Sequence, residues 1–491
     1  MAECAHPDIR DDHYPFGSGW IARETVCDDP TRRVDIRYMD VAENGTWKVS
    51  VQCTPGTRAV FGQRRNMVRL GECGGETVFY TCLTEYIPSM STKLDPGLRL
   101  FASCAGGSIL SMTAEKVRNV RRVFIAGDST VADQSAQAAW YPYDSYCGWG
   151  QMLSLFLRND AVCNQAHSGM TARCFMTDGH FGIVKRYLEK GDPVLIQFGH
   201  NDQKRSALQP FTGYTEWLKK MIGEIREKGG IPVLLSPVSR VPGKDINGPF
   251  DLLSGHSAAV KKLAEEEELL FIDLHGFTFE RYVKAGNACR DFFRPGDQTH
   301  GNDPGALINA QYAAACLNTA KLAQTEPVSL PDFFLLDRER DTVKGKPSPL
   351  PAPYLDIDVP GVSRDLILRA VQKGLMDPCV AYAHPGEPLP RGQFIQLLFR
   401  AAGLRGEGTN GSDPCPDVGP YEWDSSYAMA AVRLGMVPDG KYRSCDPVTE
   451  QEARFLCEKA GYPGFFGKDG VPDRYRIISE LLRLSDSGKP Q

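Results

Sequence analysis

The sequence predicts an α/β domain built on a parallel sheet, with a β-sandwich before it and a small helical repeat domain after it. Three observations support this prediction. Apolar and polar residues alternate in short stretches over 1–118, apolar strands alternate with helices over 119–325, and a helical pattern repeats over 355–491. At 491 residues the chain is also too long for a single hydrophobic core, which favours several domains.

Residues 1–118 alternate apolar and polar side chains in short stretches. Residues 34–38 and 47–52 show this alternation, and Asn44-Gly45 between them is a turn signal. An antiparallel sandwich of about a hundred residues fits the pattern. Such a domain could bind carbohydrate or could serve as a packing or spacer domain, and the sequence leaves both open.

The α/β prediction for residues 119–325 rests on short apolar strands separated by helices. Residues 215–228 carry apolar side chains at helical spacing and are stopped by Gly229-Gly230, and residues 257–269 are similar. Strands that alternate with helices pair in parallel, so we expect a sheet with helices on both faces. The expected strands are 123–126, 193–198, 231–235 and 269–274.

Residues 326–354 are rich in proline, which predicts a linker. Beyond it, a helical pattern at 363–376 and 388–403 recurs about fifty-five residues later, at 423–436 and 447–461, a spacing typical of repeat units. The pattern resembles a pair of S-layer homology repeats over about residues 355–465.

In that family, a Thr-Arg-Ala-Glu-type motif holds cell-wall polysaccharide. The matching positions here read Pro390-Arg391-Gly392-Gln393 and Thr449-Glu450-Gln451-Glu452. Only the first keeps an Arg, and only the second keeps Thr and Glu. We therefore expect degenerate repeats that serve packing or homo-oligomerisation through the terminal domains.

Composition and charge exclude several classes of partner. The chain is 42% hydrophobic and 24% charged with a net charge of −5, which gives no electrostatic reason to bind nucleic acid. No stretch approaches the length of a membrane-spanning helix. The amino terminus lacks the pattern of a secretory signal, which predicts a cytoplasmic protein, with a secreted or cell-surface protein after removal of a leader as the alternative. The fifteen cysteines form no Cys-x-x-Cys pair, so we expect buried free thiols and no zinc ribbon.

Residues whose side chains could take part in catalysis follow the predicted strands of the α/β domain. Gly127-Asp128-Ser129-Thr130 comes directly after the strand 123–126, and Gly199-His200-Asn201-Asp202 follows the strand 193–198. Between them lies the small polar loop Ser168-Gly169, and Asp297 precedes His300 by three residues near the end of the domain. Because ligands bind at the carboxyl ends of parallel strands, we expect these loops to meet at one edge of the sheet.

Together these residues supply the roles that acyl transfer requires. Serine is a weak nucleophile and needs an adjacent base, so Ser129 is the candidate nucleophile and His300 the candidate base. Asp297 would hold the imidazole in the right tautomer. The backbone N–H groups of Ser129 and Gly169 and the side-chain NH₂ of Asn201 are candidates for an oxyanion hole. A glycine at position 169 would let the substrate approach closely.

The blocks Gly127-Asp128-Ser129, Gly169, Gly199–Asp202 and Asp297-x-x-His300 resemble those of the SGNH (GDSL-type) hydrolases. The resemblance covers about residues 120–322 and is closest to rhamnogalacturonan acetylesterases, through motifs such as Gly148-Trp149-Gly150 and residues 236–240. It implies a three-layer, flavodoxin-like fold, the triad and oxyanion hole named above, and catalysis without metal or cofactor. Members of the family that act on pectin often carry an accessory β-domain, which residues 1–118 would match. The candidate substrate-binding residues are Asp128, Trp149, Arg173 and His200.

The resemblance implies an enzyme that removes acetyl groups from a plant polysaccharide of the rhamnogalacturonan or pectin type. The alternatives are an esterase or lipase for small acyl esters, and a non-catalytic protein that binds glycan or cell wall. The sequence also leaves two roles open for a cluster of aromatic residues after Ser129, which could stack on sugar or pack the loop. These residues are Trp140, Tyr141, Tyr143, Tyr146 and Trp149. We expect His200 to be a structural hydrogen-bonding residue more than a catalyst, and Asp202 to order its loop.

Overall fold

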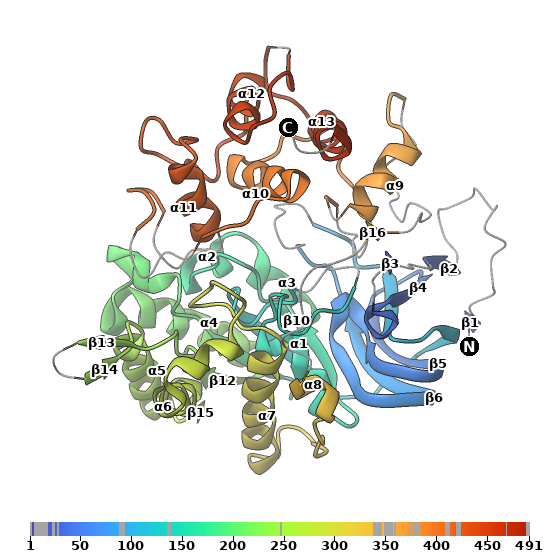
Figure 1. Cartoon of the computed structure of the whole chain (residues 1–491). Coiled ribbons are helices and arrows are strands. Elements are labelled where there is room, and N and C mark those ends of the chain that lie inside the picture. The colour runs from blue at the N-terminus through green and yellow to red at the C-terminus, as the bar shows by residue number, and fades with distance from the viewer. Residues whose placement is uncertain are drawn as a thin grey trace. The chain divides into compact units, whose positions relative to one another are not determined.

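The computed structural model describes most of the chain, in two compact units, 1–345 and 346–491. Figure 1 shows the helices and strands of both units, coloured by residue number. The described residues are 2–3, 18–21, 25–26, 29–87, 94–134, 139–245, 248–336, 346–347, 357, 360–373, 375–376, 383–407, 413–418, 424–467 and 469–487.

A parallel sheet lies at the centre of the first unit, in the order β15-β12-β11-β9-β10. Strand β9 pairs with β10 on one side and with β11 on the other, with Asn164 opposite Ile125 and Gln197 opposite Gly127. The order of the strands therefore reverses next to β9, which is where open α/β sheets place their ligands. The strands are β9 (Arg122–Gly127), β10 (Ala161–Asn164), β11 (Pro193–Gln197), β12 (Ile231–Leu235) and β15 (Leu270–Ile272).

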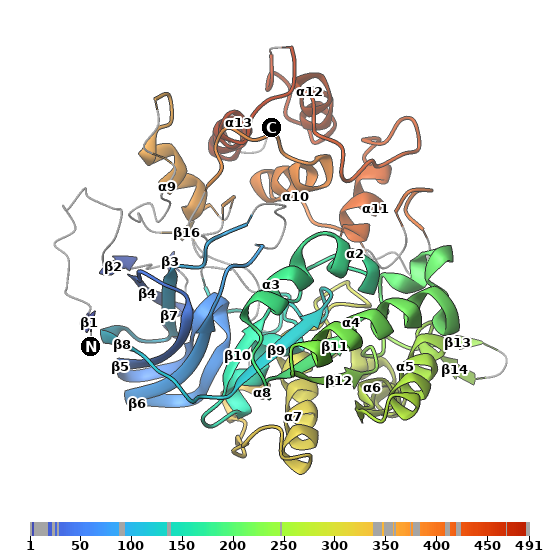
Figure 2. The same cartoon turned by 180° about the vertical axis from the view of Figure 1, so that it is seen from behind.

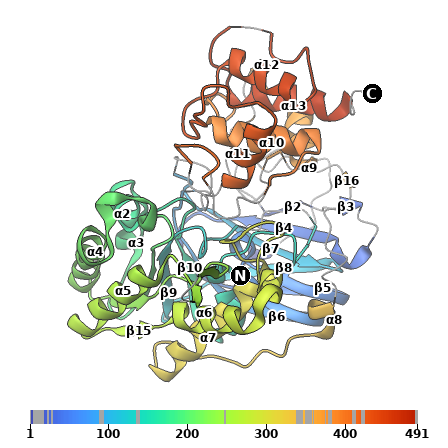
Figure 3. The same cartoon turned by 60° about the vertical axis from the view of Figure 1, so that its left-hand side comes forward.

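Helices cover both faces of this sheet, as the sequence predicted. Phe124 and Ala126 of β9 pack in one apolar cluster with side chains of α2, α3, α4 and α5. Val123 and Ile125, which alternate with them, are also fully buried. The helix α7 packs against α1 and against α6, and none of these three helices contributes to that cluster. Figure 3 shows α6 and α7 apart from α2, α3 and α4. The helices are α1 (Trp149–Leu153), α2 (Ala172–Thr177), α3 (His180–Tyr187), α4 (Thr215–Glu227), α5 (Ser254–Glu266), α6 (Leu274–Ala285), α7 (Asp303–Thr319) and α8 (Asp332–Leu336).

The expected helix over 215–228 is confirmed as α4, and Gly229 beyond its end has φ +76°. The helix expected over 257–269 begins and ends three residues earlier, as α5. Residues 326–354, expected to be a linker, contain the short helix α8, and much of that range lies outside the described residues. Short turns of 3₁₀ or π helix are η1 (Pro30–Arg32), η2 (Gln63–Arg65), η3 (Ser154–Phe156), η4 (Asp202–Lys204), η5 (Ser206–Leu208), η6 (Pro210–Tyr214) and η7 (Gly286–Phe292).

The amino-terminal strands are antiparallel and surround an apolar core of their own, which includes Val49, Val51 and Leu100. The sequence predicted a separate sandwich, whereas β6 pairs in parallel with β10 and so continues the central sheet (Figure 2). An alternating pattern shows which face of a strand is buried, but it does not show which strand lies beside its edge. The strands are β1 (Ala2–Glu3), β2 (Ser18–Ile21), β3 (Thr25–Val26), β4 (Val34–Asp40), β5 (Gly45–Phe61), β6 (Met67–Leu83), β7 (Arg99–Ala105) and β8 (Ile109–Lys116).

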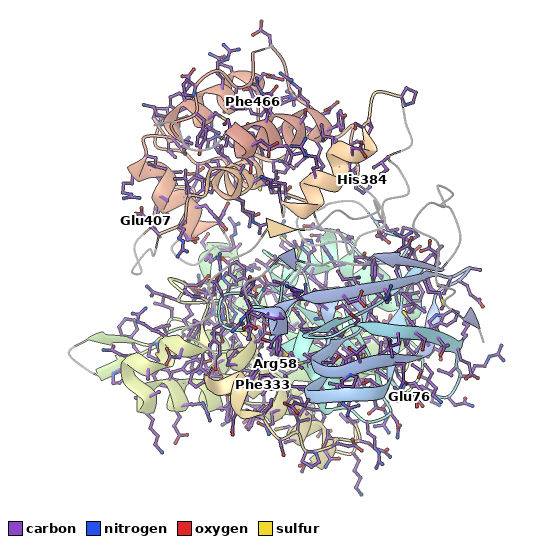
Figure 4. The ribbon with its side chains drawn as sticks, turned by 45° about the vertical axis from the view of Figure 1, so that its right-hand side comes forward. Arg58, Glu76, Phe333, His384, Glu407 and Phe466 are labelled. Atoms are coloured by element: carbon purple, nitrogen blue, oxygen red, sulfur yellow. The ribbon has the colours of Figure 1, made fainter. Side chains whose placement is uncertain are left out.

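Residues from two parts of this unit contact its last helix, α8. The guanidinium carbon of Arg58 in β5 lies 3.6 Å from the centre of the Phe333 ring in α8, and Figure 4 shows the two side chains together. The carbonyl of Phe334 in the same helix accepts a hydrogen bond from the Tyr143 hydroxyl at 2.7 Å. A small hairpin, β13 (Gly243–Asp245) and β14 (Gly248–Phe250), completes the strands of this unit.

The second unit is helical around one apolar core, to which Phe394, Leu398, Leu456 and Ile477 belong. Arg391, which matches the Arg of the S-layer motif, is 2% exposed, and its guanidinium donates to the carbonyls of Met436, at 3.1 Å, and Tyr442. At the second matching position, Thr449 and Glu452 form a capping box at the start of α12. These side chains thus make internal contacts. The elements are β16 (Lys346–Pro347), α9 (Arg364–Gln372), α10 (Arg391–Ala402), α11 (Ser425–Arg433), α12 (Glu450–Lys459) and α13 (Arg474–Ser487).

Candidate active site

Ser129 lies two residues beyond the end of β9, at the carboxyl edge of the parallel sheet. Its Oγ is 2.9 Å from Nε2 of His300, and the two residues are 4% and 3% exposed. The chain turns sharply here, because the N–H groups of Val131 and Ala132 donate back to the carbonyl of Asp128. A side chain on Gly127 would collide with this turn, since its Cβ would lie 2.8 Å from the Val131 side chain. A hydroxyl and an imidazole are therefore held in hydrogen-bond contact.

Asp297 fixes the orientation of the His300 ring. One carboxylate oxygen lies 2.9 Å from His300 Nδ1, and the other accepts the N–H groups of Thr299 at 2.7 Å and His300 at 3.0 Å. Burial alone would raise the pKa of Asp297, but the His300 ring and these N–H groups hold it well below its ordinary value. An ionised Asp297 keeps the proton on Nδ1, so the lone pair of Nε2 faces Ser129. The structure thus brings together the three residues predicted as a triad.

Gly169 and Asn201, the other predicted oxyanion donors, stand on neighbouring loops. The Asn201 amide donates to the carbonyl of Met170 at 3.0 Å, and its oxygen accepts from Lys204 Nζ at 3.2 Å. Gly169 is exposed and has φ +82°, and a Cβ there would meet no atom within 4 Å. From the sequence alone, we explain this glycine by close approach of the substrate. The structure gives a more direct reason, which is the left-handed backbone that other residues adopt with strain.

The side chain of Asp202 orders the loop that carries Asn201, as the sequence predicted. Its two carboxylate oxygens accept the N–H groups of Ala172 at 2.9 Å and of Gly199 at 3.0 Å. Burial raises the pKa of Asp202 to about 7. The carboxyl group therefore links the loop after β11 to the amino end of α2, the helix that follows the Gly169 loop.

The structure places three of the four residues predicted to contact substrate inside the domain, and their contact with substrate stays a prediction. Asp128 and Trp149 are 0% exposed and His200 is 1% exposed. Asp128 Oδ2 lies 3.4 Å from His200 Nδ1, and burial lowers the pKa of His200 although Asp128 opposes the change. Arg173 is exposed on α2 and remains a candidate contact.

The aromatic residues after Ser129 pack the loop. Trp140, Tyr141 and Tyr143 are buried like Trp149, and Trp140 Nε1 donates to Asp303 at 2.9 Å. The fifth, Tyr146, stands edge-on to the catalytic imidazole, with 5.1 Å between the ring centres and 89° between the planes. Of the two roles that the sequence left open, the structure favours packing over a sugar-stacking wall for the four buried rings.

A buried hydrogen-bond chain beneath Ser129 was missed from the sequence. Trp149 Nε1 donates to Gln197 Oε1 at 2.8 Å, and Gln197 Nε2 donates to Thr130 Oγ1 at 2.8 Å. The Thr130 hydroxyl donates in turn to Asp128 at 2.7 Å. The available signal was Gln197 itself, a polar residue in an otherwise apolar central strand. The chain joins the Ser129 turn to the neighbouring strand β11.

Arg240, which ends the motif 236–240, connects two of the catalytic loops. It is 2% exposed, and its guanidinium donates to the carbonyl of His200 at 3.0 Å and to the hydroxyl of Thr299. Its backbone N–H donates to Asp251 at 2.8 Å. Because Thr299 directly precedes His300, Arg240 positions the histidine loop against the loop of Asn201.

Within the described residues, no group of three or more His, Cys, Asp and Glu side chains is placed to hold a metal ion. Nor does the described part of the chain include a helix long and apolar enough to span a membrane. The cysteines that the structure describes as free are mostly buried.

Comparisons with known proteins agree with this geometry. Residues 125–308 match the GDSL-like lipase/acylhydrolase family. The chain is 34% identical to the rhamnogalacturonan acetylesterase RhgT of Bacillus subtilis over 209 residues, which is 39% of this chain and 88% of that protein. It is 30% identical to the B. subtilis protein named "Probable rhamnogalacturonan acetylesterase YesY" over 42% of this chain and 96% of that one.

Among solved structures, the B. subtilis protein YxiM aligns over 62% of this chain and 91% of its own, with 22% identity and a TM-score of 0.38. The family match spans β10, β11, β12, β15 and the carboxyl end of β9, and it includes the three residues of the Ser129–His300–Asp297 arrangement. The chain therefore belongs to the GDSL-like lipase/acylhydrolase family and is a serine hydrolase that acts on esters.

Proposed function

We propose that this esterase removes acetyl groups from a rhamnogalacturonan-type plant polysaccharide, or from its oligosaccharides, through an acyl-Ser129 intermediate. The ester chemistry rests on the position of His300 between two partners. Its Nε2 lies 2.9 Å from Ser129 Oγ, and its Nδ1 lies 2.9 Å from Asp297 Oδ2. The choice of substrate is supported by the relatives named as rhamnogalacturonan acetylesterases.

In the first half of the proposed reaction, Ser129 Oγ attacks the acetyl carbonyl carbon while His300 Nε2 takes the hydroxyl proton. The carbonyl oxygen becomes an oxyanion, which the N–H groups of Ser129 and Gly169 and the Asn201 amide would stabilise. His300 then returns the proton to the sugar oxygen, which leaves as the free hydroxyl.

In the second half, water attacks the acetyl-serine ester and His300 takes its proton. The second tetrahedral intermediate collapses, the proton returns to Ser129 Oγ, and acetate leaves. Throughout both halves Asp297 stays ionised and stabilises the charged imidazole, which its depressed pKa supports. Hydrogen bonds to the Met170 carbonyl and from Lys204 Nζ orient the Asn201 side chain for its role as an oxyanion donor.

Acetate release from acetylated rhamnogalacturonan and from acetylated xylan, by the wild type and by Ser129→Ala, tests the proposal. We expect release from rhamnogalacturonan by the wild type alone. Better release from xylan would replace the proposed substrate and keep the nucleophile. Hydrolysis of an aryl acetate without release from either glycan would favour a small-ester esterase, and inactivity on all three would favour a non-catalytic glycan-binding protein.

A further inference from the structure

The turn between β5 and β6 holds two consecutive residues with left-handed backbones. Arg64 has φ 51° and ψ 33°, and Arg65 has φ 62°. Non-glycine residues adopt this conformation at a cost in free energy and keep it only where surrounding contacts enforce it. Such strain is concentrated at functional sites, so the contacts of this turn are informative.

Arg64 reaches from the amino-terminal strands into the two loops that carry the nucleophile and Gly169. Its Nη2 donates to the carbonyl of Asn164, the last residue of β10, from which the Gly169 loop starts. Its Nε lies 3.3 Å from Asp133, four residues after Ser129. The guanidinium also lies 4.8 Å from the centre of the Tyr86 ring. One side chain therefore contacts both loops.

The two groups that Arg64 contacts are bound to each other. The Asn164 amide donates to Asp133 Oδ1 at 2.9 Å and to the Val131 carbonyl at 2.9 Å. The Asp133 side chain is 7% exposed, and burial raises its pKa to about 6, with Arg64 acting against that rise. Without the guanidinium, this buried carboxylate would lose the cation that offsets its desolvation.

The neighbouring Arg65 provides a second connection through its backbone. Its carbonyl accepts a hydrogen bond from Gln151 Nε2 at 3.1 Å. The other end of the Gln151 amide accepts the N–H of Gln134 at 2.8 Å, and the Gln134 side chain donates to the carbonyl of Ser129. The strained turn thus supports the nucleophile through two independent chains of contacts.

We propose that Arg64 is a positioning residue of the esterase site, which holds the Ser129 loop and the Gly169 loop in register by bridging Asp133 and Asn164. The amino-terminal strands accordingly complete the active site and are more than a spacer or a glycan-binding appendage. The inference concerns the ester chemistry and not the glycan, so it is tested on an aryl acetate and does not depend on the proposed substrate.

The test compares Arg64→Met with Arg69→Met in the full-length protein. Both arginines are half-buried on the same hairpin. The described hydrogen bonds of the Arg69 side chain go to the Glu76 carbonyl and the Thr77 hydroxyl, both in β6. We expect Arg64→Met to lower kcat for the aryl acetate by about tenfold or more with KM changed by less than about twofold, because small displacements of reacting groups are costly. Arg69→Met should leave kcat unchanged. Equal effects of the two variants would overturn the proposal.

Two further variants separate positioning from a loss of folding. Arg64→Lys keeps the charge near Asp133 and should retain most of the wild-type kcat, so it remains informative if Arg64→Met does not fold. Adding Asp133→Asn to Arg64→Met removes the unpaired carboxylate and should recover part of the lost kcat. A wild-type kcat in folded Arg64→Met, or a full loss in Arg64→Lys at an unchanged melting temperature, contradicts this role.

Discussion

Replacing Asp297 with Asn tests the orientation of the imidazole most directly. In the structure one oxygen of Asp297 accepts two backbone N–H groups, from Thr299 and His300, and the other faces His300 Nδ1 at 2.9 Å. An Asn side chain would keep its oxygen toward the two N–H groups, because the reverse orientation leaves two donors without an acceptor. Its NH₂ would then donate to Nδ1, which forces the imidazole proton onto Nε2. His300 could no longer accept the proton of Ser129.

We expect Asp297→Asn to lower kcat by about four orders of magnitude, equivalent to about 5 kcal/mol in the activation barrier. The melting temperature should change little, because the two backbone hydrogen bonds persist and the third is kept with its donor and acceptor exchanged. The assay is the steady-state hydrolysis of an aryl acetate at saturating substrate. Asp178→Asn, which neutralises an exposed carboxylate at the end of α2, is the matched control. A kcat for Asp297→Asn within tenfold of the wild type would refute the tautomer argument.

Three other predictions concern the surrounding residues. Asn201→Ala should lower kcat by about a hundredfold to a thousandfold through loss of an oxyanion donor, and an unchanged kcat in the same assay would remove Asn201 from the scheme. Trp149→Phe should lower the free energy of unfolding in urea by about 1–3 kcal/mol, because it leaves the buried Gln197 oxygen without its 2.8 Å donor; no change would mean that this bond is dispensable. Because the pKa of Asp202 rises from 3.8 to about 7 on folding, its contribution to stability is complete below about pH 4 and is lost as the pH rises through about 7. Asp202→Asn should remove that part of the pH dependence in urea titrations between pH 4 and 8, and an unaltered dependence would contradict the assignment.

The candidate catalytic residues could be singled out from the sequence because each follows a local pattern. Ser129 and Asn201 come after short apolar strands, and Asp297 and His300 are three residues apart in one turn. Parallel strands bring their carboxyl ends to one edge, so the meeting of the first two loops follows from the fold class. The buried position of Trp149 did not follow, because an aromatic residue near a site can stack on a ligand or pack a loop with the same local sequence.

The sequence by itself determined the class of the central domain and singled out Ser129, His300 and Asp297 as candidate nucleophile, base and orienting acid, because these inferences depend on hydrophobic periodicity and on turn residues close in the chain. Tertiary structure alone decided that β6 pairs with β10 and that Arg64 reaches Asn164 and Asp133. Strand partners and contacts between residues a hundred positions apart are selected by packing and by burial of charge. Packing and burial of charge produce no periodic pattern in the sequences of the segments that meet, so these contacts could not be predicted from the sequence.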